Sequence, residues 1–265
     1  MEHKKTQKNS GNKKTENNTG WGNVATWYDG HLQDDDTYHA KVIVPNLTRL
    51  VALKPTESLL ELGCGQGFVL EKFSKYSPHL TGVDIGAELI AIAQKNNPKI
   101  SYHTASADDQ AILKGETFDA IMIVLALQNM KNLSGVVDNV ARLLKENGRA
   151  YLVLNHLAFR IPQNSDWLFD DKKNVQARRV DKYMSETEIS IDMNPGKKTN
   201  KEMTSSFHRP LQVYSKAFAK QGLAITKIEE WISHKESQKG PRALAENAAR
   251  KEFPMFMCLE LRICR

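Results

Sequence analysis

Short apolar runs alternate with amphipathic stretches between Ser58 and Leu154, and this alternation leaves few folds open to the chain. Helical spacing of apolar residues predicts three helices in this region, and Gly148 predicts a helix stop before the last strand. Nearly continuous apolar strands that alternate with helices are typical of a parallel sheet covered by helices on both faces. The sequence therefore predicts an α/β domain, with strands at 58–62, 80–83, 100–103, 118–124 and 149–154 and helices at 68–75, 87–96 and 133–144.

Two helices are predicted upstream of this core. Residues 22–32 and 37–53 both have helical patterns, and Asp36 is a suitable N-cap for the second helix. Pro45 lies inside that second pattern, where a proline kinks a helix or restarts it. We expect these segments to form a helical cap.

Downstream of the core, residues 161–210 are polar and contain one alternating pattern. Residues 183–193 and 203–207 flank an Asn-Pro-Gly turn signal at 194–196 and predict an antiparallel hairpin. After it, the pattern predicts a helix at 211–221 and closing strands at 224–231 and 255–264. We expect one domain over residues 21–265, with a cap at 21–56, a core at 57–155, an insertion at 156–210 and the C-terminal helix and strands at 211–265.

The N-terminal tail carries half of the net charge. Residues 1–20 hold five lysines, two glutamates and no aliphatic or aromatic residue beyond Met1, so we expect a disordered basic tail of charge +3. The formal net charge of the whole chain is +6, which leaves a modest +3 for the rest. Such a tail can contact nucleic acid or an anionic membrane, or simply keep the protein soluble.

Composition also limits compartment and cofactor class. Cys64, Cys258 and Cys264 are too few and too scattered for a disulfide framework, and no Cys/His spacing indicates a metal site. The longest purely apolar run, 120–127, is far shorter than the roughly 20 residues that a membrane span needs. The N-terminus lacks the apolar segment of a signal peptide. We therefore expect a cytoplasmic protein without a membrane span or a bound metal.

A glycine loop follows the first predicted strand. Glycines let the backbone turn tightly and approach a ligand closely, and Asp84 ends the next strand about 20 residues further on, where a carboxylate can bind ribose hydroxyls. The loop has the spacing G-x-G-x-G, and Phe68 stands where the third glycine of a dinucleotide fingerprint would fall. Glu61, just before the first glycine, would repel a phosphate and attract an ammonium group. The loop Glu61-Leu62-Gly63-Cys64-Gly65-Gln66-Gly67 thus predicts an adenosine-type ligand without a pyrophosphate.

These motifs resemble the core of the class I S-adenosylmethionine-dependent methyltransferases, in particular their small-molecule, type 11-like branch. The resemblance covers residues 58–155 and implies S-adenosylmethionine as the cofactor. It also implies a Rossmann-like, doubly wound sheet of seven strands, mostly parallel with the last strand antiparallel, and here a hairpin insertion after strand five. By this resemblance Glu61 serves the amino group of the cofactor, Asp84 holds the ribose, and the methionine and ribose portions are lined by Gly63, Gly65 and Gly67.

The resemblance extends to the adenine site and to the cap. Ile85 is implied to pack on the adenine, and the segment containing Ala107 stands where relatives often have Asp-Ala after the third strand. The contact with the adenine amino group is open between Ser106 and Asp108. Tyr28, in a segment similar to the A-x-x-Y-D helix of this branch, is implied to face the methionine end.

Methyl transfer is an in-line displacement, so the enzyme mainly aligns the acceptor, the methyl group and the sulfur. A general base is needed only for an acceptor that arrives protonated with a high pKa. Residues 125–129 stand where an Asn/Asp-Pro-Pro-Tyr/Phe segment would follow the fourth strand, which argues against methylation of adenine amino groups in DNA. The acceptor is expected to contact the cap and the insertion.

Five residues of the insertion are candidates for the acceptor site. His156 or His208 could act as a base, and Arg160 or Arg209 could bind an anionic acceptor. Each of them could instead be a structural residue paired with a nearby aspartate. The candidates in chain order are His156, Arg160, Tyr183, His208 and Arg209, with Tyr38 and His39 of the cap as further choices.

Several functions remain open at this point. The first hypothesis is a small-molecule methyltransferase in which the insertion forms a lid. The second is an RNA or protein methyltransferase that uses the tail and the insertion, although the body has no dense basic stripe with interleaved aromatics. A third is a non-catalytic S-adenosylmethionine-binding protein, and a Rossmann oxidoreductase is a distant fourth. The acceptor atom and the oligomeric state are not determined by the sequence.

Overall fold

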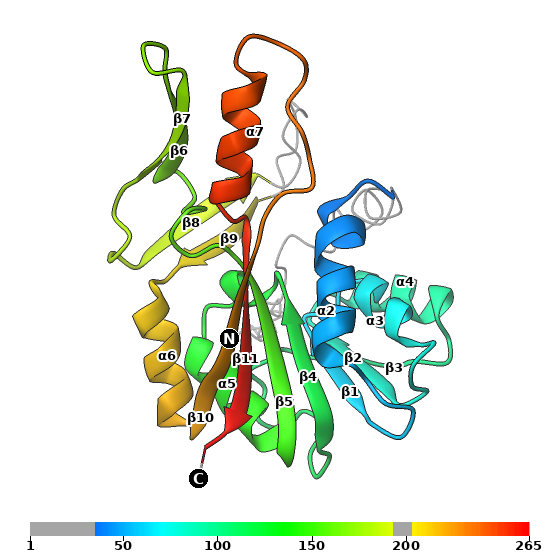
Figure 1. Ribbon diagram of the computed structural model, residues 1–265. Helices are drawn as coiled ribbons and strands as arrows, with labels where there is room; N and C mark the ends of the chain where they lie inside the picture. Colours follow the sequence, from blue (N-terminus) through cyan, green and yellow to red (C-terminus); the bar gives the residue numbers. More distant parts are fainter. Residues whose placement is uncertain (1–34, 193–202, 265) are drawn as a thin grey trace, which may run out of the picture.

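A central sheet of seven strands organises the chain in a computed structural model, which describes residues 35–192 and 203–264 (Figure 1). Its strand order is β3-β2-β1-β4-β5-β11-β10. β11 runs antiparallel to both β5 and β10, whereas the pairs among β1 to β5 are parallel. This confirms the predicted Rossmann-like fold. The strands are β1 (Leu59–Leu62), β2 (Leu80–Asp84), β3 (Ser101–Thr104), β4 (Phe118–Val124), β5 (Leu144–Asn155), β10 (Leu223–Trp231) and β11 (Phe256–Ile263).

The strands divide their apolar side chains between two separate clusters, one on each face of the sheet. In β4, Ile121 and Ile123 belong to one cluster, while Ala120 and Met122 belong to the other. Successive side chains of a strand point to opposite faces, so a continuous apolar run buries both. The first cluster packs on α5 (Leu133–Leu143) and α6 (Leu211–Lys220), and the second on α2 (Val44–Val51), α3 (Phe68–Phe73) and α4 (Ala87–Asn96), as Figure 1 shows.

The described part of the cap begins with a π-helical turn, η1 (His39–Ile43), that leads directly into α2. Pro45 lies in the first turn of α2, where its missing N–H costs nothing, so the predicted restart of the helix is confirmed. The predicted N-cap was wrong. The hydroxyl of Thr37 accepts from the backbone N–H of Ala40 (3.1 Å), while the carboxylate of Asp36 binds His234 at 3.0 Å. The helix predicted at 22–32 lies outside the described residues.

The insertion contains two hairpins rather than one. The predicted hairpin is present as β8 (Thr187–Asp192) and β9 (Met203–His208). The sequence analysis missed a second hairpin, β6 (Ser165–Asp170) with β7 (Val175–Val180), and the helix α7 (Ala243–Glu252). α7 and the β6–β7 hairpin stand together beyond the sheet in Figure 1. The division of the chain into cap, core and insertion stays a prediction.

Aromatic and ionic contacts join α7 to the β6–β7 hairpin. The ring of Phe253, just after α7, meets the ring of Trp167 edge-on at 5.5 Å. Arg242 binds Asp171 at 3.0 Å and lies over the ring of Phe169. Because Trp167 and Leu168 remain substantially exposed, this unit has a small core, and its strands lack the strong apolar alternation that would predict them.

The helix before β5 ends earlier than Gly148. α5 stops at Leu143 and the chain enters β5 at once, with an irregular register against β4 between Phe118 and Ala120. Gly148 lies inside β5 rather than in a helix stop, so that prediction was wrong. In the described part of the chain, no helix is long and apolar enough to cross a membrane.

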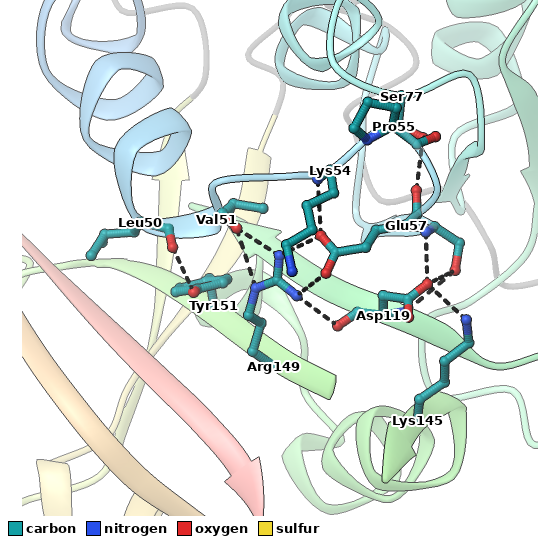
Figure 2. A network of polar contacts seen from close by, with 11 residues as sticks. Leu50, Val51, Lys54, Pro55, Glu57, Ser77, Asp119, Lys145, Arg149 and Tyr151 are labelled. Atoms are coloured by element: carbon teal, nitrogen blue, oxygen red, sulfur yellow. Dashed lines mark hydrogen bonds and ion pairs between the residues drawn. The ribbon is translucent and has the colours of Figure 1, made fainter. Parts of the chain in front are cut away.

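A polar network ties the C-terminal end of α2 to the edge of the sheet that lies opposite the strand ends Leu62 and Asp84 (Figure 2). The guanidinium of Arg149 donates to both carboxylate oxygens of Glu57 (2.8 and 3.2 Å) and to the carbonyl of Val51 (2.7 Å). Asp119 accepts from the backbone N–H and hydroxyl of Ser58, and from Lys145 at 2.7 Å. The network thereby holds the end of α2 against the starts of β1 and β4.

The carboxyl group of Asp119 makes part of the folding stability depend on pH. Burial raises the pKa of Asp119, but the Lys145 ammonium and the Ser58 donors outweigh it and lower the pKa to about 2. A depressed carboxyl pKa contributes stability that is present above the ordinary value near pH 4 and is lost as the pH falls toward 2.

Asp119→Asn is therefore expected to lower the free energy of unfolding by about 1–2 kcal/mol at pH 7 and by less at pH 3. Urea unfolding at the two pH values measures the difference. Glu116→Gln, at an exposed position just before β4, is the control and should change little at either pH. A loss that is equal at pH 7 and pH 3 would contradict the assignment.

Candidate active site

A cavity of about 490 Å³ opens at the carboxyl ends of the parallel strands. Segments that follow β1, β2, β3 and β4 contribute to its wall, together with His39 of η1 and Thr204 of β9. Ligands of open α/β sheets bind at this edge, where loops meet in a crevice. The structure brings most of the predicted cofactor residues together on this wall: Glu61, Gly63, Gly65, Asp84, Ile85, Ser106, Ala107 and Asp108.

All three glycines of the loop after β1 have left-handed backbone angles, with φ of 74° at Gly63, 53° at Gly65 and 80° at Gly67. A Cβ atom at Gly65 would stand in open space, so this residue keeps the cavity clear. A Cβ atom at Gly63 would lie 2.6 Å from the Cβ of Ala126. Gly67 is the N-cap of α3 and does not line the cavity; its missing side chain makes room for the hydroxyl of Tyr102.

Asp84 ends β2 with both carboxylate oxygens held. One oxygen accepts from the N–H of Gly65 (2.9 Å) and the other from the N–H of Gly86 (2.8 Å). Burial raises the pKa of Asp84, although these two backbone donors oppose the shift. Each carboxylate oxygen can accept a further hydrogen bond, so Asp84 can still receive two hydroxyl groups of a ligand.

Glu61, the last residue but one of β1, has fewer hydrogen-bond partners than Asp84. Its side chain is only 2% exposed, and its Oε2 has no hydrogen-bond partner. Burial, and then the negative charge of Asp84, raise the pKa of Glu61 well above its usual value. An unpaired buried carboxylate oxygen is costly, and a cationic group placed in the cavity would relieve that cost.

The segment after β3 forms a polar chain along the cavity. The hydroxyl of Ser106 donates to one carboxylate oxygen of Asp108, and the amide of Asn132 donates to the other at 2.9 Å. Burial raises the pKa of Asp108, but these two hydrogen bonds outweigh it and the pKa is lowered. Ile85 and Leu89 add apolar surface nearby on the same wall. Both alternatives for the adenine contact, Ser106 and Asp108, therefore belong to one hydrogen-bonded unit.

His156 lies outside the cavity wall, and its ring is fully engaged. Nδ1 accepts from the N–H groups of Ala158 (3.2 Å) and Phe159 (3.1 Å), which leaves the proton on Nε2. Nε2 lies 2.6 Å from the carboxylate of Glu230, and the ring stacks on Phe159. These contacts stabilise the turn after β5, and neither ring nitrogen of His156 is left free to act as a base toward a methyl acceptor.

Two further insertion residues stabilise the hairpin. Nε2 of His208 donates to the carbonyl of Tyr183 (2.8 Å), and the hydroxyl of Tyr183 accepts from the N–H of Leu211 (3.1 Å). Both are absent from the cavity wall. The structure thus groups Tyr183 and His208 with each other rather than with the cofactor residues.

The two predicted arginines also make internal contacts. Arg160 donates to the side-chain oxygen of Asn155 (2.9 Å), and burial lowers the pKa of Arg160. Arg209 is buried and donates to the carbonyls of Met130 (3.0 Å) and Lys131 (2.8 Å). Since Met130 and Lys131 line the cavity, Arg209 ties the end of the insertion to the cavity rim.

The two cap candidates separate in the structure. His39 lines the cavity and meets the ring of Phe68 edge-on, whereas Tyr38 points to Ser233 and Phe256. Tyr28 lies outside the described residues. Residues that were not predicted as individual contacts also line the wall: Cys64, Gln66, Phe68, Lys131, Asn132 and Thr204. Gln66 could have been found from its place inside the glycine loop, but nothing in the sequence pattern of β9 marks Thr204.

The sequence of residues 60–152 matches the family described as "Methyltransferase domain". This is the stretch that carries the glycine loop, Asp84 and the wall after β4. Residues 60–152 therefore form a class I S-adenosylmethionine-dependent methyltransferase domain. The predicted family and its methyl donor are thereby confirmed.

Curated relatives of the methyltransferase match it over part of their length. A ubiquinone biosynthesis O-methyltransferase from Hydrogenovibrio crunogenus is 26% identical over 162 residues, which are 52% of this chain and 67% of that protein. Other proteins of the same name match over 40% to 53% of their length. The chain thus spans about half the length of most curated relatives that it matches.

Solved structures share the fold over most of the chain. The S-adenosylmethionine-dependent methyltransferase from Mesorhizobium loti has a TM-score of 0.67 at 21% identity, covering 86% of this chain and 99% of that one. The DhpI–SAH complex has a TM-score of 0.59 at 14% identity, covering 92% of this chain and 93% of that one. At these identities the similarity shows the fold.

The cavity of the methyltransferase fits S-adenosylmethionine in its own chemistry. The unpaired Oε2 of Glu61 suits the ammonium group of the methionine portion, and the spare acceptor sites of Asp84 suit the ribose hydroxyls. The open space beside Gly65 leaves room for the ligand between them.

The glycines of the loop are expected to differ in what an added methyl group disturbs. Gly63→Ala combines a left-handed φ with a clash against Ala126 and should lower the free energy of unfolding by about 2–3 kcal/mol. Gly65→Ala meets no atom and should cost only about 1 kcal/mol, yet its methyl group occupies ligand space and should weaken binding of S-adenosylhomocysteine. Urea unfolding and calorimetric titration separate the two effects. A Gly63→Ala variant as stable as Gly65→Ala would contradict this geometry.

Proposed function

We propose that this methyltransferase transfers the methyl group of S-adenosylmethionine to a small-molecule acceptor. The proposal rests on one cavity, in which Glu61 and Asp84 lie near the ends of neighbouring strands. Residues of the cap and of the β8–β9 hairpin complete its wall. A volume of about 490 Å³ falls in the range of small-molecule sites.

The cofactor roles follow from the contacts of each side chain. Asp84 is held by the N–H groups of Gly65 and Gly86 and would accept the two ribose hydroxyls. Glu61 would bind the ammonium group, and Ile85 would pack on the adenine beside the Ser106–Asp108 unit. Together they would fix the sulfonium relative to the open end of the cavity, which is the alignment that in-line transfer requires.

The cap and the insertion both contribute to the cavity wall, which favours a small acceptor over a polymer. Thr204 of the hairpin and His39 of the cap both line the wall, so segments far apart in the sequence cover the same space. Arg209 holds the insertion to the rim through the carbonyls of Met130 and Lys131. The curated relatives are named ubiquinone biosynthesis O-methyltransferases, so by name they act in the synthesis of a small molecule. This similarity supports an oxygen atom as the methyl acceptor here.

Calorimetric titration of S-adenosylmethionine and S-adenosylhomocysteine tests the cofactor part of this proposal. Wild type is expected to bind both with micromolar affinity, about −7 to −8 kcal/mol. Asp84→Ala removes the ribose acceptors and should weaken binding at least about 30-fold, or about 2 kcal/mol.

Asp109→Ala is the matched control. Asp109 is an exposed aspartate that follows Asp108 in the chain, and unlike Asp108 it does not line the cavity. It should bind like wild type. Thermal melting of each variant without ligand shows whether the loop that Asp84 supports remains folded. Wild type that binds NAD but neither adenosyl ligand would overturn the proposal.

A further inference from the structure

Two side chains on the cavity wall each hold a buried polar atom without a hydrogen-bond partner. One is Oε2 of Glu61, an acceptor, and the other is Nε2 of Gln66, a donor. Gln66 is only 3% exposed, and Glu61 is 2% exposed. The carboxylates of Asp84 and Asp108, on the same wall, have partners on both oxygens.

Such atoms are unusual in a folded protein because a buried polar group without a partner has lost its hydrogen bonds to water and gained none in return. A ligand that supplies the missing partners removes this cost when it binds. The ligand needed here carries a cationic donor for Glu61 and an acceptor for Gln66. An α-amino acid group, with its ammonium and carboxylate on one carbon, carries both.

Four backbone N–H groups of the glycine loop are already used inside the protein. The N–H groups of Gly63 and Cys64 both donate to the carbonyl of Val83, at 2.7 and 3.0 Å. The N–H of Gly65 donates to Asp84, and that of Gly67 donates to the carbonyl of Cys64 (3.0 Å). The side-chain amide of Gln66, by contrast, is a buried donor in this loop that still lacks a partner and that a ligand can use.

We propose that Gln66 binds the α-carboxylate of the methionine portion of the cofactor through its side-chain amide, while Glu61 binds the neighbouring α-ammonium. The inference rests on the proposed function, because it assigns this residue within the same cofactor site. Gln66 thereby distinguishes the intact amino acid end from an adenosyl ligand that has an amine alone.

Removing the carboxylate from the ligand tests the contact directly. Calorimetric titration compares S-adenosylhomocysteine with its decarboxylated analogue, which keeps the amine. In wild type, loss of the carboxylate should weaken binding about tenfold, or about 1.4 kcal/mol. Gln66→Met keeps the side-chain volume, should weaken S-adenosylhomocysteine about tenfold, and should leave the affinity of the analogue within about twofold.

A second variant reverses the sign of the interaction. Gln66→Glu places a carboxylate against the carboxylate of the ligand and should weaken S-adenosylhomocysteine more than Gln66→Met does. It should also tighten binding of the decarboxylated amine. Gln212→Met repeats the first substitution at an exposed position of α6 and should change neither affinity.

The outcomes separate this inference from the function on which it rests. Equal affinity of wild type for both ligands, or an equal loss for both in Gln66→Met, would overturn the role of Gln66 and leave the cofactor assignment standing. Absence of binding of either ligand to wild type would overturn the proposed function itself.

Discussion

Burial of two carboxyl groups at neighbouring strand ends is the constraint on which the active edge of this protein depends. Glu61 is the last residue but one of β1 and Asp84 ends β2, and the parallel pairing of the two strands brings these ends to one edge of the sheet. Burial raises the pKa of both groups, and for Glu61 the charge of Asp84 adds to the effect. The fold compensates Asp84 with two backbone donors but leaves an oxygen of Glu61 unpaired. The free protein therefore holds a local electrostatic cost that a cationic ligand group would relieve.

The remainder of the fold keeps this edge rigid. Two apolar clusters, one on each face of the sheet, fix the strands whose ends carry the site. At the opposite edge, Arg149 joins the end of α2 to Glu57, which lies just before β1. The same helix follows directly on the π-turn that brings His39 to the cavity, so the anchoring of α2 also positions the cap over the site. Rigid support of this kind is what alignment of a displacement reaction requires.

The core of the fold could be predicted because its signals are local. The apolar runs of β1, β2 and β4 are buried on both faces, and a continuous apolar run followed by glycine or aspartate marks such a strand without knowledge of its neighbours. The grouping of Glu61, Gly65 and Asp84 on one cavity wall could be predicted for the same reason, since these residues lie at fixed positions relative to the ends of those strands.

The insertion could not be predicted to the same degree. The β6–β7 hairpin and α7 are held by cross-chain contacts such as Trp167 with Phe253, and sequence patterns do not report which distant segments meet. His156 and His208 look like functional histidines in the sequence, because a histidine after a strand is equally suited to a base and to a structural hydrogen bond. Only the contacts with Glu230 and with the carbonyl of Tyr183 show that both rings are used internally. Gln66 was overlooked because a glutamine between two glycines carries no charge pattern.

The central claim is that the cavity receives the amino acid end of an adenosyl ligand at Glu61 and its ribose at Asp84. A crystal structure of the protein with S-adenosylhomocysteine tests this most directly. The account predicts the ammonium group within hydrogen-bond distance of Glu61 and both ribose hydroxyls on the carboxylate of Asp84. A ligand bound in the reverse direction, with its adenine against Glu61, or bound away from the carboxyl ends of β1 and β2, would contradict it.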